Sequence, residues 1–248
     1  MRLSFCLCLV FLAALPTAAQ STLGLKPGAY VHYEPIGLGR SYGTNGYNTD
    51  GYGSTSHHVL TAGIVREDGW DYGLRVGTFT DGAFRLDASD YGERYDVRSY
   101  LVGAVVGRTT PRTDRWATRL QGETWALLDT QRGIGSLGIG SVGARLDAST
   151  GYRVGYEGFS LTPTLGAYVQ SEHRFGSSFV ASGPGDTQPT LYGIPARTDL
   201  EIGLRAALPL LFRLGRVPIT LVPSLEMGVG SAGFGSTGRA GLGVQVDF

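Results

Sequence analysis

The sequence predicts an all-β fold, a closed antiparallel β-barrel that spans a membrane with about ten strands, eight being the alternative count. Three observations predict it: alternating apolar and polar residues, connections that alternate in length, and an unusual composition. Glycine supplies 39 of 248 residues, about twice its usual share of ~7%. Charged residues make up 17%, against roughly 25% in an average soluble domain. Helices favour Ala, Leu, Glu and Lys, and the only lysine is Lys26, so a helix-rich protein is disfavoured.

Alternation is clearest in two segments near the C-terminus. The even positions from 200 to 210 read Leu, Ile, Leu, Ala, Leu and Leu, and the odd positions from 217 to 229 read Val, Ile, Leu, Pro, Leu, Met and Val. Because successive strand side chains point to opposite faces, each segment has one apolar face and one polar or small face. The same reasoning predicts ten strands, at about 27–38, 56–66, 69–80, 96–108, 115–128, 138–155, 159–170, 198–211, 217–229 and 239–248.

The connections between these segments alternate in length. Those after the even-numbered segments are short, whereas long polar stretches follow the first, third and seventh segments, at 39–55, 81–95 and 171–197. Short turns at one end and long loops at the other are typical of transmembrane barrels, whose turns face the periplasm and whose loops face outward. An even strand count also returns both ends of the barrel to the periplasmic side.

The N-terminal residues predict a cleaved export signal. Arg2 precedes an apolar run at 3–15, and small residues at 16–19 suit cleavage before Gln20. The apolar run is too short to cross a hydrocarbon core of ~30 Å, for which a helix needs about 20 residues. We therefore expect export out of the cytoplasm without a membrane-spanning helix.

Both cysteines, Cys6 and Cys8, lie in this N-terminal segment. The expected layout is a signal peptide at 1–19 and a barrel domain at 20–248. In such a mature chain there is no cysteine for a disulfide, a thiol nucleophile or a Cys-ligated zinc site.

The last expected strand resembles a known family. Apolar residues occupy every second position back from its final residue, at Ala240, Leu242, Val244, Val246 and Phe248. This pattern resembles the terminal strand of bacterial outer-membrane β-barrel proteins, and the whole chain is similar in pattern to their small OmpA-type and opacity-type members. The resemblance implies residence in the outer membrane, contact with its lipid and lipopolysaccharide, and recognition of these five residues by the barrel-assembly machinery. Neither a cofactor nor a nucleic acid is expected as a partner.

Charged residues of both signs are expected to point into the barrel on these registers. They are Asp71, Arg75, Arg119, Glu123, Arg145, Asp147, Glu201, Arg205 and Glu226. Barrels of about eight strands have interiors that side chains can fill, whereas aqueous porins need 16–18 strands. Pairing between arginines and carboxylates would narrow the passage further. We therefore expect a largely plugged lumen, and the alternative is a narrow channel for small solutes or ions.

The expected role is structural or a surface interaction, without enzymatic activity. An extracellular ligand could bind through the loops at 39–55, 81–95 and 171–197. The first of these carries Tyr42, Tyr47 and Tyr52 among Gly, Asn and Ser, a composition typical of adaptable binding surfaces.

An outer-membrane hydrolase is the less favoured alternative. A protease similar to the ten-stranded outer-membrane proteases would need Asp and His at the barrel rim, for which Asp186, Asp199 and His173 are available. A lipid A-modifying enzyme would need Ser and His near the lipid, as at 56–58. No spacing of His, Asp or Glu predicts a metal site, which needs three or four convergent donors, so no catalytic or metal-binding residue is assigned.

Overall fold

The computed structural model describes most of the expected barrel domain. It describes residues 27–42, 53–81, 97–130, 137–156, 158–175, 177–181, 190–194, 196–215, 217–231 and 236–248. The expected signal peptide lies outside the described residues. Within them, no helix has the length and hydropathy needed to cross a bilayer.

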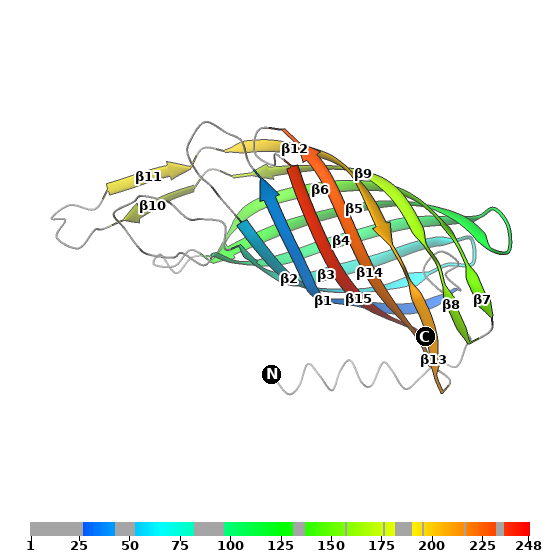
Figure 1. Cartoon of the computed structure of the whole chain (residues 1–248). Coiled ribbons are helices and arrows are strands. Elements are labelled where there is room, and N and C mark those ends of the chain that lie inside the picture. Colours follow the sequence, from blue (N-terminus) through cyan, green and yellow to red (C-terminus); the bar gives the residue numbers. More distant parts are fainter. Residues whose placement is uncertain are drawn as a thin grey trace, which may run out of the picture.

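Ten antiparallel strands close into one barrel, which confirms the predicted fold class and count (Figure 1). The strands run in the spatial order β12, β9, β6, β5, β4, β3, β2, β1, β15 and β14, and the pairing of β14 with β12 closes the ring. Their bounds are β1 Gly28–Tyr42, β2 Gly53–Val65, β3 Trp70–Asp81, β4 Val97–Pro111, β5 Trp116–Thr130, β6 Leu137–Tyr152, β9 Thr164–Arg174, β12 Arg197–Ala207, β14 Val217–Gly230 and β15 Ser236–Asp247.

Three of these strands continue, after a break, into a short strand: β7 (Val154–Tyr156) continues β6, β8 (Phe159–Leu161) precedes β9, and β13 (Leu210–Leu214) continues β12. Two of the breaks contain proline, at Pro163 and Pro209. Proline has no N–H to donate to the ladder, so the pairing is weakened at both positions. Each of the three expected segments is therefore one barrel strand with an interruption that the alternation did not predict.

The strand ends form two different rims. We call one the turn rim, because it holds the turns at 66–69 and 112–115 and the connections from β7 to β8 and from β13 to β14, and the C-terminus lies at this end beside β8 and β13 (Figure 1). Two of these turns use a glycine in a left-handed conformation, with φ of 82° at Gly69 and 66° at Gly215. The opposite end, from which the longer connections leave, is the loop rim.

The expected loop at 171–197 is wrong in its extent. β9 continues to Arg174, and β10 (Ser177–Ala181) pairs with β11 (Thr190–Ile194) in a separate two-stranded sheet beyond the loop rim (Figure 1). The Gly, Pro and Ser residues around these short strands hide them from a search for alternation. The other two expected loops narrow to 43–52 and 82–96, which lie outside the described residues.

The barrel wall separates an apolar outer face from a polar inner face. Outward residues such as Leu74, Ile202 and Met227 are 70%, 61% and 65% exposed, whereas the inward Asp71 and Glu201 are 0% exposed. This arrangement inverts that of a soluble protein and is typical of a barrel surrounded by lipid.

Candidate functional site

Aromatic rings fill part of the interior by lying over inward glycines of neighbouring strands. The Trp125 ring covers Gly143, and the Tyr168 ring covers Gly203, so closely that a β-carbon at either glycine would overlap the ring. In the same way, the Tyr30 ring lies against the inward face at Gly63. Part of the high glycine content is thereby explained, since only glycine lets a side chain lie flat across the wall.

The first of two charged groups in the interior, the β3–β5 cluster, comprises Asp71, Arg75, Arg119, Gln121 and Glu123. Arg119 donates through both terminal nitrogens to the two Asp71 oxygens, each at 2.7 Å. Its Nε donates to Gln121 at 2.9 Å, and Gln121 in turn donates to Glu123. Arg75 forms an ion pair with the same Glu123. Bidentate arginine–carboxylate pairs of this kind are among the strongest hydrogen bonds in proteins.

This cluster lies along the wall, because its ion pairs bridge only the one strand between β3 and β5. That strand, β4, presents Gly107 beneath the Asp71–Arg119 pair, and a β-carbon there would overlap both side chains. Thr109 of β4 accepts a hydrogen bond from Arg119 at 3.1 Å. The β3–β5 cluster therefore braces three adjacent strands.

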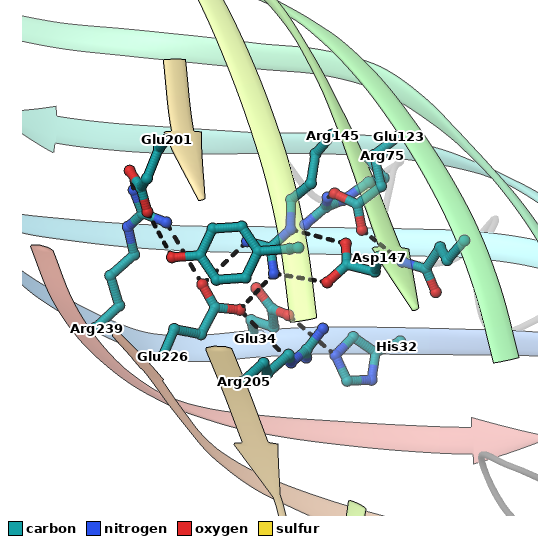
Figure 2. Close-up of polar contacts among 12 residues, drawn as sticks. His32, Glu34, Arg75, Glu123, Arg145, Asp147, Glu201, Arg205, Glu226 and Arg239 are labelled. Carbon is teal, nitrogen blue, oxygen red and sulfur yellow. Dashed lines mark hydrogen bonds and ion pairs between the residues drawn. The ribbon is translucent and has the colours of Figure 1, made fainter. Parts of the chain in front are cut away.

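The second group, the β6–β14 cluster, crosses the interior (Figure 2). Its centre is Arg145 of β6, which donates to both oxygens of Asp147 at 2.7 and 2.8 Å. It also donates to both oxygens of Glu226 on β14, at 3.0 and 2.9 Å. Two strands, β9 and β12, lie between β6 and β14 in the wall. The side chains must therefore meet inside the barrel, along a chord and not along the wall.

Glu226 is a shared acceptor in the β6–β14 cluster. In addition to Arg145, Arg205 and Arg239 approach its carboxylate to 3.5 and 3.4 Å. Arg239 also donates to Glu201 at 2.8 Å, and the Tyr168 hydroxyl donates to the same Glu201. The guanidinium carbon of Arg145 lies 4.0 Å from the centre of the Tyr168 ring. Stacking and ion pairing together hold these groups in one layer across the lumen.

The structure places all nine charged residues of the sequence prediction on the inner face. Five belong to the β6–β14 cluster and four to the β3–β5 cluster. The two clusters adjoin where Glu123 of β5 and Arg145 of β6 lie directly opposite each other in the strand register (Figure 2). Sequence reasoning missed Arg239, although it has the same parity as the inward Gln245 on β15. It also missed Tyr168, whose inward position follows from the alternation of β9.

The residues considered for a hydrolase do not converge where the structure describes them. Asp199 faces inward and is 3% exposed. His173, next to the inward Glu172, faces outward, and its ring lies 2.9 Å from the Thr198 hydroxyl. Asp186 and the side chains at 56–57 lie outside the described residues. Nor does the described part of the chain hold three His, Asp or Glu groups placed to bind a metal ion.

No protein-family model and no curated protein matches the chain. Among solved structures, the beta domain of the Bordetella autotransporter BrkA is similar, with 15% identity over 90% of this chain and 99% of that chain and a TM-score of 0.51. The chain has the fold of the bacterial outer-membrane β-barrels. Neisserial surface protein A matches 89% of this chain and 97% of its own chain at 11% identity and a TM-score of 0.43. Ail, the attachment invasion locus protein of Yersinia pestis, matches 90% of this chain and 100% of its own chain at 11% identity and a TM-score of 0.33.

Proposed function

We propose that this chain is exported by its N-terminal signal and acts as an outer-membrane barrel with a structural or surface-interaction role and a largely plugged lumen. The turn rim would face the periplasm and the loop rim the cell exterior. The outward residues of β15 from Ala240 to Val246, together with Phe248 directly after the strand, would serve as the assembly signal.

The chord from Arg145 to Glu226 carries the proposal of a plugged lumen. Both side chains are nearly buried, at 10% and 13% exposed, and Arg145 donates hydrogen bonds to both oxygens of Glu226 as well as to both oxygens of Asp147. The Tyr168 ring below Arg145 and the neighbouring Arg239 add bulk to the same layer. A layer of charged groups that pair with one another obstructs the passage of ions. To pass, an ion would have to replace a charge-assisted hydrogen bond of the layer.

Single-channel conductance of refolded residues 20–248 in a planar bilayer tests this proposal. We expect no steady conductance from the unaltered chain and a measurable one from the double variant Arg145→Ala/Glu226→Ala, which removes the chord. The matched control, Asp71→Ala/Arg119→Ala, removes a pair that lies along the wall and should open far less. Folding of each variant is checked by heat-modifiable gel mobility. Passive sugar uptake by the unaltered chain in liposomes would contradict the proposal.

The hairpin of β10 and β11 supports the surface-interaction role. Its register pairs Phe179 with Tyr192 and Val180 with Leu191, in a two-stranded sheet that is separate from the sheet of the barrel. A ribbon of only two strands has two backbone edges with which a binding partner could pair. Replacing 177–194 with a short Gly-Ser turn should leave the barrel folded and abolish contact between bacteria that display the chain. This contact is measured as the rate at which the bacteria aggregate and settle from suspension. Equal settling of both strains would count against the hairpin as a contact surface.

A narrow cation channel is the second candidate function. Among the described residues, inward carboxylates outnumber inward arginines: Glu34, Asp71, Glu123, Asp147, Glu172, Asp199, Glu201, Glu226 and Asp247 against Arg75, Arg119, Arg145, Arg205 and Arg239. An excess of one sign in a narrow lumen favours counter-ions. Any residual conductance should then be cation-selective, which the reversal potential across a KCl gradient measures. Anion selectivity would exclude this candidate.

A further inference from the structure

Two arginines lie opposite each other at the turn rim, just beyond the ends of β5 and β6. The pairing of these strands ends at Trp116 and Tyr152. The Arg153 N–H donates to the Arg115 carbonyl at 2.7 Å, which continues the pairing by one residue. Because Trp116 and Tyr152 are exposed on the outer face, both arginines have inward parity. We call Arg115 and Arg153 the arginine pair, and it stands at the mouth of the lumen.

No carboxylate balances the arginine pair within the described part of the chain. Neither guanidinium has an ion-pair partner or a side-chain hydrogen bond among those residues. The inward carboxylates deeper in the lumen, Asp71 and Asp147, are already bound by Arg119 and Arg145. Like charges directly opposite each other on a sheet repel and are destabilising. An anion between the two arginines would relieve this repulsion.

Two buried hydroxyl groups lie on the strand next to Arg153. The register between β6 and β9 continues unchanged between β7 and β8, and it places Thr162 opposite Arg153. Ser160, the next inward residue of this strand, pairs with Gly155. Thr162 and Ser160 are 3% and 4% exposed, and neither hydroxyl has a hydrogen-bond partner among the described residues. Burial of a hydroxyl without a partner costs free energy, so a ligand that accepts hydrogen bonds here would be stabilised.

The inner face around these groups offers no competing acceptor. One row deeper in the lumen, Ala117, Gly151 and Thr164 lie side by side on three neighbouring strands. None of them carries a charge or a long side chain. Arg115 is exposed and Arg153 is half-buried, so an anion can reach the arginine pair from the mouth.

We propose that the arginine pair and the hydroxyls of Thr162 and Ser160 form a binding site for a phosphate group. This group is either free phosphate or the phosphate of a small organic molecule. The tetrahedral oxygens of phosphate can accept hydrogen bonds from two guanidinium groups and from hydroxyls at the same time. A carboxylate has only two oxygens, which one guanidinium fork already occupies. The site opens to the periplasm in the proposed orientation, but binding depends neither on that orientation nor on a plugged lumen.

Equilibrium dialysis of the refolded chain against radiolabelled inorganic phosphate tests this phosphate site. The chain is kept in a nonionic detergent at constant ionic strength, so that the general screening of charges is equal in all samples. We expect one saturable site per chain. Labelled glycerol 3-phosphate, dialysed in parallel, shows whether the site takes only free phosphate or also a phosphate group carried by an organic molecule.

The arginine half of the site is tested by Arg115→Gln and Arg153→Gln. Each change should weaken phosphate binding by about tenfold, because it removes charge-assisted hydrogen bonds, and the double variant should show no saturable binding. The matched control is Arg66→Gln/Arg108→Gln, which removes the same charge from two exposed arginines of the turn rim that do not face the lumen. The control should bind phosphate as the unaltered chain does. Folding of every variant is checked by heat-modifiable gel mobility.

The hydroxyl half of the site is tested by Thr162→Val. This change should weaken phosphate binding by about fivefold, the effect of one lost hydrogen bond. Thr220→Val is the matched control, because the Thr220 hydroxyl is also buried without a partner among the described residues. Thr220 lies on β14, and β13 separates it from β8. Its replacement should leave phosphate binding unchanged.

Equal binding by the unaltered chain and by Arg115→Gln/Arg153→Gln would overturn the proposal. The same loss in Arg66→Gln/Arg108→Gln would also overturn it, since the overall charge of the rim would then explain the binding. A folded chain without saturable phosphate binding, or one that binds labelled acetate as tightly as phosphate, would contradict the phosphate site. Steady conductance from a chain that still binds phosphate in this way would refute only the plugged lumen, so the two proposals fail separately.

Discussion

The two charged clusters of the interior use the same residue types with different geometry. In the β3–β5 cluster, arginines reach over one strand, and Gly107 of that strand makes room beneath them. In the β6–β14 cluster, Arg145 reaches past two strands to Glu226. The first cluster staples adjacent strands, whereas the second connects distant parts of the wall. The distance between partners around the barrel, and not the number of ion pairs, therefore distinguishes a brace from an obstruction.

The clusters also differ in how many partners each carboxylate retains when one arginine is lost. Asp147 receives two hydrogen bonds, one on each oxygen, and Arg145 donates both. Glu123, in contrast, is bonded by both Arg75 and Gln121. The β6–β14 cluster is consequently the more vulnerable of the two to a single substitution.

The largest effect is expected for Arg145→Met. This change removes the hydrogen bonds and the positive charge that Arg145 supplies to Asp147 and Glu226 in a nearly buried layer. Removing one partner of a buried ion pair costs about 3–5 kcal/mol, and we expect a loss of that size in the free energy of unfolding. Urea unfolding of vesicle-inserted protein, followed by tryptophan fluorescence, measures it. Arg205→Met is the control, because Arg205 is 30% exposed and its Nε lies 3.5 Å from the Glu226 carboxylate, a weaker ion pair than that of Arg145. Equal losses in the two variants would show that the chord is not special.

The next effect concerns the glycine under the same cluster. Gly203→Ala should destabilise the barrel by about 2–3 kcal/mol, because a β-carbon there would overlap both the Tyr168 ring and the Met227 carbonyl of β14. Gly122→Ala on β5 is the matched control, with the nearest atom at 3.6 Å, an ordinary contact. The midpoint of heat modification on gels compares the two. Similar midpoints would mean that the ring over Gly203 moves aside freely.

Much of this fold could be predicted from residue parity, and so could the inner face. The breaks could not, because two residues separate β12 from β13 and so Leu208 and Leu210 keep the parity of Ala206. A period-2 pattern passes through such an interruption unchanged. Pairing partners inside the lumen were equally hidden: Arg145 and Glu226 are 81 residues apart, and only the order of strands around the ring brings them together. Parity gives the face of a residue but not its partner.

A smaller effect is expected in the β3–β5 cluster. Arg75→Met should cost about 1–2 kcal/mol, because Glu123 keeps its hydrogen bond from Gln121. The double variant Arg75→Met/Gln121→Leu removes both donors and should cost clearly more than the sum of the two single changes. The same urea experiment measures all three. Strict additivity would show that the two donors do not substitute for each other, and the contrast with Asp147 would then lose its basis.

The smallest effect is expected outside the lumen, at Asp68→Asn in the first short turn. Asp68 is an ion-pair partner of Arg66 at 3.3 Å, but the two side chains are 50% and 60% exposed. Exposed pairs contribute about 0–1 kcal/mol, so unfolding should change by less than about 0.5 kcal/mol. Asp71→Asn, three residues further on, removes the charge of a side chain that is 0% exposed and bound by Arg119 at two points. A clear loss there beside no change at Asp68 would show that stability depends on whether a carboxylate is buried in the lumen or exposed in a turn. If both changes were silent, the β3–β5 cluster would not be a brace.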